Sequence, residues 1–176
     1  EEGACVVVCN HVSYVDALII GGTIRRPIRF VMYHKIFKVP VLSFIFRTAK
    51  AIPIAGHKEN PELLNEAMYT IAEALEQGEV VCMFPEGKLT SDGDMNEFKS
   101  GIERIIEKTP VPVVPMALQG LWHSLFSRKK VNKFIDRLKR LRTKVKLVVA
   151  EPVSPDEASK ERLYTMVKEL RNNVTT

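Results

Sequence analysis

The chain has 176 residues, of which 45% are hydrophobic, and this suits one globular domain with a substantial core. Its three cysteines form an odd number without paired spacing, which favours reduced thiols in a cytosolic compartment and argues against a disulfide framework. The net charge of +5 is uneven, because ten Lys or Arg residues and a single acid lie within residues 127–146.

In chain order, continuous apolar runs alternate with segments of helical periodicity. The runs that predict strands are residues 4–9, 28–33, 51–54, 79–84, 111–118 and 144–150. Helices are predicted from Ser13 as N-cap to Gly21, from Asn60 to Gly78, over 101–108, over 127–146, and from Ser154 onwards. We therefore expect an α/β fold in which a sheet of mostly continuous apolar strands is flanked by helices on both faces.

The sequence starts abruptly, with "EEGACVVVCN" leading almost directly into a buried strand and without a Met or a signal peptide. No internal repeat, low-complexity tract or linker rich in Pro and Gly divides the chain. We expect residues 1–176 to form a single domain that was cut from a longer polypeptide.

Residues 36–46, "IFKVPVLSFIF", are apolar and are flanked or interrupted by four cations. This segment is too short for the ~20 apolar residues of a membrane-spanning helix, but it is suited to the interface of a bilayer. An ordinary core helix or strand explains the same apolar pattern, and periodicity does not choose between them.

The basic segment 127–146 carries a local charge of +9, which indicates a polyanionic partner. We expect it to form a helix on an anionic membrane surface through Lys129, Lys130, Arg137 and Arg140. Nucleic acid is not the expected partner, because such surfaces interleave aromatic with basic residues and only Phe134 is aromatic here. A solvated charged helix is the alternative.

Two polar clusters, "NHVSYVD" at 10–16 and "FPEGKLTSDGD" at 84–94, each follow a predicted buried strand. Because sites in α/β sheets form at the carboxyl ends of strands, both clusters are expected to line one cleft. Asp16 would lie on the first turn of a helix and point back toward His11. A carboxylate there fixes the imidazole tautomer and leaves the second ring nitrogen as a general base.

The alternative for each cluster is structural: His11 and Asp16 form an incidental pair, and Glu86 is a solvated acid in a Pro-Glu-Gly turn. The sequence has no G-x-S-x-G motif for a serine hydrolase and no phosphate-binding G-x-x-x-x-G-K-[ST] loop. Its histidines and cysteines lack the spacing of metal ligands. We therefore expect neither a metal nor a cofactor.

Taken together, the motifs resemble those of the glycerophospholipid acyltransferase family, which includes the lysophosphatidic acid acyltransferases. N-H-x-S-x-x-D is matched by Asn10, His11, Ser13 and Asp16, and F-P-E-G is matched by residues 84–87. A proline-bearing strand at Val114-Pro115 and an F-K-x-G element at 98–101 follow in the family's order. The resemblance covers residues 5 to about 120.

The resemblance implies direct acyl transfer, without a covalent enzyme intermediate. His11 would deprotonate the free hydroxyl of a lysophospholipid, which attacks the thioester of acyl-CoA or acyl carrier protein, while Asp16 orients His11 and stabilises the imidazolium. Glu86 and Gly87 would hold the glycerol–phosphate part of the acceptor, and nearby cations would hold its phosphate. The expected substrate-binding residues are Asn10, Ser13, Lys58, Glu86, Gly87, Lys88 and Thr90.

Two departures from the family pattern concern arginines that grip phosphate. The third motif often continues Thr-Arg-Ser, whereas this chain has Lys88 and Leu89 followed by Thr90, and Gly56 stands in the arginine position of the second motif. The stretch "EGKLTSDG" is similar to that of the subgroup that reacylates lysophosphatidylethanolamine. Domains of that subgroup are often fused to a lysophospholipid transporter, an acyl–carrier-protein synthetase, or both.

We therefore expect a lysophosphatidylethanolamine acyltransferase of phospholipid remodelling, peripheral to the cytoplasmic face of a membrane. One alternative is a lysophosphatidic acid acyltransferase of phospholipid biosynthesis. An alternative from another class is a non-catalytic membrane- or nucleic-acid-binding module that uses the basic segment alone.

Overall fold

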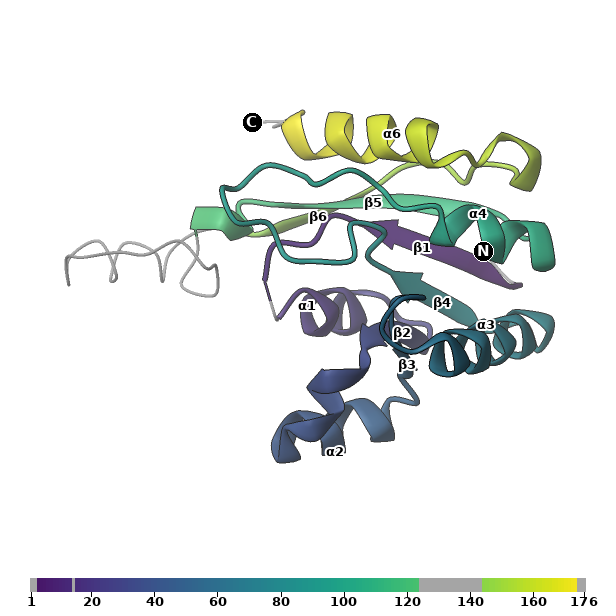
Figure 1. Cartoon of the computed structure of the whole chain (residues 1–176). Helices are drawn as coiled ribbons and strands as arrows, with labels where there is room; N and C mark the ends of the chain where they lie inside the picture. The colour runs from purple at the N-terminus through teal and green to yellow at the C-terminus, as the bar shows by residue number, and fades with distance from the viewer. Residues whose placement is uncertain (1–2, 14, 124–143, 174–176) are drawn as a thin grey trace.

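The computed structural model describes residues 3–13, 15–123 and 144–173 (Figure 1). Six strands form one sheet in the order β3-β2-β4-β1-β5-β6. The strands pair in parallel from β3 to β5, and β6 pairs antiparallel to β5 at the edge. Their bounds are β1 Cys5–Cys9, β2 Ile28–Tyr33, β3 Ile52–Ile54, β4 Val80–Met83, β5 Val113–Gln119 and β6 Lys146–Val149.

Helices pack on both faces of this sheet, with α6 on one side and α1 on the other (Figure 1). The side chains of α3, α4 and α6 belong to one buried cluster, and those of α1 and α2 belong to a second. The α-helices are α1 Asp16–Thr23, α2 Pro40–Thr48, α3 Pro61–Glu76, α4 Gly101–Lys108 and α6 Lys160–Asn172. Short 3₁₀ turns are η1 His34–Lys38, η2 Leu121–His123 and η3 Pro155–Glu157.

The central strand β1 shows why the strands read as continuous apolar runs. Val6 and Val8 pack into the first cluster, whereas Val7 and Cys9 pack into the second. Successive side chains of a strand point to opposite faces, so a strand covered on both faces needs apolar residues at every position. The expected α/β architecture is confirmed.

Two helix starts differ from the sequence expectation. The first helix begins at Asp16, not directly after Ser13, because the Ser13 hydroxyl donates to the Asp16 carboxylate and accepts the N–H of Val15. The last helix begins at Lys160, because Ser159 is extended and its side chain caps the N–H of Arg162. The 3₁₀ turn η3 stands where that helix was expected to start.

The segment 34–50 is partly buried and partly exposed. It folds into η1 and α2, and Phe46 of α2 is buried with 3% of its surface exposed, as in a core helix. Phe44 of the same helix is 74% exposed. Within the described ranges, no helix combines the length and the apolar composition needed to cross a bilayer.

Candidate active site

The site forms where the neighbouring parallel strands β1 and β4 end. The chain leaves β1 at Cys9 and continues into His11, and it leaves β4 at Met83 and continues into Glu86. A small hollow is lined by residues of both loops, including His11 and Glu86. The two polar clusters therefore meet in one site, as their positions after the strands predict.

The expected contact between His11 and Asp16 is present. The Nδ1 atom of His11 lies 2.8 Å from Oδ2 of Asp16. An ionised carboxylate can only accept, so Nδ1 carries the proton and Nε2 keeps a free lone pair. This tautomer is the one that a general base requires.

Asp16 is held rigidly, with none of its side chain exposed. Its carboxylate accepts the N–H of Val12 at 2.7 Å, the N–H of Ser13 at 3.0 Å and the hydroxyl of Ser13 at 2.8 Å. These donors compensate the burial of the charge, and they fix the oxygen that faces His11. Ser13 therefore acts on Asp16 and is buried away from solvent.

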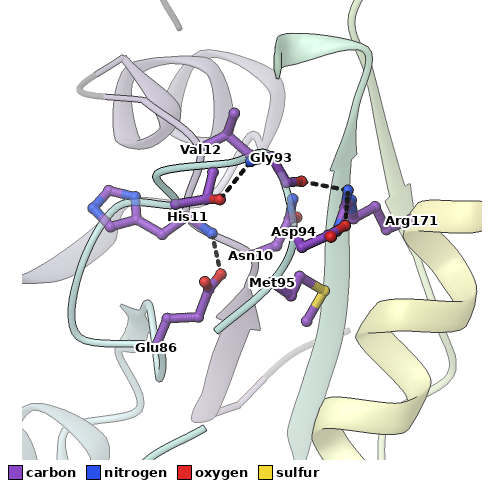
Figure 2. Close-up of a pocket in the computed structure, with 9 residues that line it drawn as sticks. Asn10, His11, Val12, Glu86, Gly93, Asp94, Met95 and Arg171 are labelled. Carbon is purple, nitrogen blue, oxygen red and sulfur yellow. Dashed lines mark hydrogen bonds and ion pairs between the residues drawn. The ribbon is translucent and has the colours of Figure 1, made fainter. Parts of the chain in front are cut away.

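The imidazole of His11 remains accessible, because 20% of its side chain is exposed. It stacks on Phe84, with ring centroids 4.2 Å apart and planes 17° apart. Figure 2 shows the ring turned away from Asp94 and Arg171, on the opposite side of the His11 backbone from these residues. The hollow and the imidazole thus lie on opposite sides of the His11 main chain.

Glu86 occupies a different position from that expected of an acceptor-binding residue. It is 1% exposed, and its Oε1 accepts the N–H of His11 at 2.7 Å. Its Oε2 accepts the N–H and the side-chain amide of Asn96 at 2.7 and 2.9 Å. The carboxylate therefore joins the loop after β4 to the backbone of His11, as Figure 2 shows. Both of its oxygens are engaged inside the protein.

Asn10 and Thr90 are also buried and bonded within the protein. The Asn10 side chain accepts the N–H of Leu118 at 2.7 Å and donates to its carbonyl at 3.1 Å, which ties the end of β1 to β5. The Thr90 hydroxyl accepts the N–H of Gly93, and the Thr90 N–H donates to the carbonyl of His11. Both residues shape the loops around His11.

Two exposed cations of this site lie near Gly87. Gly87 has a φ of +66°, and a β-carbon there would lie 2.7 Å from Nζ of Lys99. The ammonium of Lys99 therefore lies against the main chain directly after Glu86, where only glycine leaves room. Lys88 is exposed beside it in sequence. Lys58 follows β3, three strands from β1 and so roughly 14 Å across the sheet.

Three residues of the site were missed in the sequence analysis: Lys99 as a cation of the site, and Asn96 and Arg171. Asn96 has no signal in sequence, because its bond to Glu86 depends on how the loop closes. Arg171 of α6 donates to the carbonyl of Gly93 and lies 3.7 Å from Asp94.

The expected membrane residues Lys129, Lys130, Arg137 and Arg140 lie outside the described residues.

The cysteines near the site are not suited to nucleophilic attack. Burial raises the pKa of the Cys9 thiol well above its ordinary value, and burial likewise raises the pKa of Cys82. Both thiols are therefore protonated at neutral pH, whereas the thiolate is the nucleophile. In the parts of the chain that the structure describes, no group of three His, Cys, Asp or Glu side chains is arranged to hold a metal.

Comparison with known proteins finds acyltransferases of similar sequence and fold. A 1-acyl-sn-glycerol-3-phosphate acyltransferase of Bacillus subtilis is 28% identical over 178 residues, covering 98% of this chain and 80% of that protein. A chloroplastic 1-acyl-sn-glycerol-3-phosphate acyltransferase of Brassica napus is 31% identical over 120 residues, covering 68% of this chain and 34% of that protein. The crystal structure of the 1-acyl-sn-glycerophosphate acyltransferase of Thermotoga maritima matches 96% of this chain and 65% of its own, with a TM-score of 0.73 and 25% identity.

The chain spans about a third of the length of the chloroplastic acyltransferases of Brassica napus and Arabidopsis thaliana that it matches. The family model described as Acyltransferase matches residues 1–119, which include the His11–Asp16 pair, the Glu86 loop and most of the sheet. Because that match extends over more than half of the sequence, the chain belongs to the Acyltransferase family.

Proposed function

We propose that this protein transfers a fatty acyl group from a thioester to the free hydroxyl of a 1-acylglycerol-3-phosphate. The observation that carries the proposal is the His11–Asp16 pair, in which a buried carboxylate holds an accessible imidazole in the tautomer of a base. A hydroxyl is a weak nucleophile at neutral pH, and general-base catalysis is the usual means of activating it.

The proposed reaction has two proton transfers at one nitrogen. Nε2 of His11 takes the proton of the acceptor hydroxyl as its oxygen bonds to the thioester carbonyl carbon. The carbon–sulfur bond then breaks, and the imidazolium returns the proton to the leaving thiolate. Asp16 stabilises the imidazolium between these steps. A thioester is already activated, so the step needs no acyl-enzyme, and the raised pKa values of Cys9 and Cys82 agree with this.

The acceptor is proposed from the relatives, since those of Bacillus subtilis, Brassica napus and Thermotoga maritima are all named for acylglycerol phosphate. A phosphate monoester carries nearly two charges and needs cations close to the base. Lys99 lies against Gly87 and Lys88 follows it, so two ammonium groups are available beside the loop that bonds to His11. The donor is a thioester of coenzyme A or of acyl carrier protein.

Lysophosphatidylethanolamine is the second candidate acceptor, and specific residues favour it. Leu89 and Gly56 stand where the family pattern has arginines, so a bidentate grip on a doubly charged phosphate is missing at both positions. A phosphodiester that carries ethanolamine has one phosphate charge and a cation of its own. Single lysines are adequate partners for such a headgroup.

A transfer assay that crosses two donors with several acceptors tests the proposal. Acyl-CoA and acyl carrier protein would each be offered with lysophosphatidic acid and lysophosphatidylethanolamine at equal concentration, and rates would be compared head to head. A higher kcat/KM for lysophosphatidic acid supports the main proposal. A clear preference for lysophosphatidylethanolamine would replace it with the second candidate, and no transfer to either acceptor would refute both.

We further propose that the protein is peripheral to the cytoplasmic face of a membrane, where a lysophospholipid acceptor resides. This placement is supported by the lipid nature of the acceptor and by the +9 charge of residues 127–146.

A further inference from the structure

The helix α2 exposes apolar side chains on one side while its other side packs into the core. Phe44 is 74% exposed and Phe46 is 3% exposed, and residues two apart on a helix point in directions roughly 200° apart. Ile45 and Val39 are also exposed. We call Val39, the extended residue directly before α2, together with Phe44 and Ile45 of α2, the α2 patch. A cluster of large apolar side chains in water indicates a contact surface more than a single exposed residue does.

The charged residues of the segment that contains the α2 patch are all cations. Residues 34–50 contain Lys35, Lys38, Arg47 and Lys50 and no Asp or Glu. Lys35 pairs with Glu59 at 2.9 Å, and Arg47 donates to the hydroxyl of Ser43. In the described part of the chain, no carboxylate pairs with Lys38, Arg47 or Lys50.

The α2 patch also follows the end of the sheet at which the parallel strands have their carboxyl ends and at which the active site lies. β2 runs parallel to β4, so its carboxyl end at Tyr33 lies at the same edge as the carboxyl end of β4. The chain passes from that end through η1 into α2, which lies away from the sheet beyond α1 (Figure 1). Contact through α2 would therefore bring the edge that carries His11 toward the contacted surface.

We propose that the α2 patch and its cations are the surface through which this enzyme binds an anionic lipid bilayer. A bilayer offers acyl chains to Phe44 and Ile45, and phosphate headgroups to Lys38, Arg47 and Lys50 around them. This arrangement combines an apolar centre with three cations that no described carboxylate pairs with. The proposal deepens the proposed function by naming its membrane-binding surface, and it delivers a lipid acceptor to the edge where His11 lies.

Vesicle flotation of the whole chain tests the surface with a matched pair of variants. Phe44→Ser removes an aromatic side chain from the α2 patch, and Tyr69→Ser removes one of similar exposure, 71%, from α3. On vesicles of phosphatidylcholine with phosphatidylglycerol, Phe44→Ser should bind about tenfold or more weakly, since burying a phenylalanine is worth roughly that factor or more. Tyr69→Ser should bind like the parent. Equal binding by all three proteins would overturn the proposal.

Substitution of the cations beside the α2 patch tests the proposal independently of Phe44. Lys38→Gln with Lys50→Gln should weaken binding to vesicles containing phosphatidylglycerol by about tenfold or more, and should leave the weaker binding to pure phosphatidylcholine unchanged. Unchanged binding to the anionic vesicles would show that other basic residues hold the membrane, and would overturn the role proposed for these cations.

Insertion of α2 can be measured by fluorescence with the variant Phe44→Trp. Lipids with brominated chains should quench the tryptophan fluorescence of this variant well beyond that of the parent, in which Trp122 gives the background. No additional quenching would refute insertion of α2.

Activity measurements separate this proposal from the proposed function. With acceptor dispersed in detergent, Phe44→Ser should turn over like the parent, and with acceptor in vesicles it should be slower in proportion to lost binding. If Phe44→Ser lowers the turnover rate by the same factor in detergent as in vesicles, the membrane role of Phe44 is overturned. If the parent transfers no acyl group in either medium, the proposed function fails, while the binding measurements still decide the surface.

Discussion

Replacing Asp16 by Asn tests the proposed base most directly, because it keeps the shape of the side chain and removes its charge. Oδ2 of Asp16 accepts His11 Nδ1, Val12 N–H and Ser13 N–H, whereas Oδ1 accepts only from Ser13. An Asn amide therefore places its NH₂ at the Oδ1 position, where the Ser13 hydroxyl can accept it. The carbonyl oxygen remains toward His11, and the ring tautomer is preserved.

The expected magnitude follows from the charge alone. A hydrogen bond to a charged group contributes about 1.5–3 kcal/mol and one between neutral groups about 0.5–1.5 kcal/mol. Stabilisation of the His11 imidazolium in the transition state should thus fall by roughly 1–2 kcal/mol, which lowers kcat about 5- to 30-fold. His11→Ala should lower it by ~10²-fold or more, because the base itself is lost. Should the amide flip, the imidazole tautomer would invert and the loss would approach that of His11→Ala.

The assay follows release of the free thiol from acyl-CoA with each acceptor, and circular dichroism confirms that the variants fold. If Asp16 acts through His11, Asp16→Asn should have little further effect in a His11→Ala background, since residues that act as a unit are not additive. A folded Asp16→Asn or His11→Ala protein with the parent kcat would refute the mechanism. An equal fold-loss from Asp16→Asn in both backgrounds would show that Asp16 acts only on the structure.

Three further predictions concern the rest of the site. Glu86→Gln places an amide NH₂ against an N–H donor of His11 or Asn96, so it should lower the unfolding free energy by about 1–3 kcal/mol and lower kcat with little change in acceptor KM. Calorimetry and steady-state kinetics measure these changes, and a raised KM with unchanged stability would mean that Glu86 contacts the acceptor instead. Lys99→Ala and Lys88→Ala should each raise the acceptor KM more than the donor KM, measured by steady-state kinetics with both substrates varied. A rise in the donor KM alone would contradict a role of these lysines in binding the acceptor phosphate. Iodoacetamide at neutral pH should leave activity unchanged, because the raised pKa values keep Cys9 and Cys82 protonated; inactivation that tracks their labelling in mass spectra would refute this.

The sequence by itself determined the α/β class and the contact between His11 and Asp16, because both depend on local pattern. An uninterrupted apolar run such as Cys5–Cys9 already encodes a strand covered on both faces. The spacing of His11 and Asp16 places a carboxylate on the first turn of α1, within reach of the loop before it, and the two meet at 2.8 Å.

Only the tertiary structure decided the roles of the other polar residues. Glu86 was expected to hold the acceptor, yet its partners are the backbone of His11, 75 residues earlier, and Asn96 across the loop. Whether a carboxylate faces solvent or is buried among N–H donors depends on how distant loops close over it, and composition carries no trace of that. The exposure of Phe44 beside the buried Phe46 has the same origin, since Phe46 packs against Phe37 of η1 and joins the second buried cluster, whereas the side of α2 that carries Phe44 is left free.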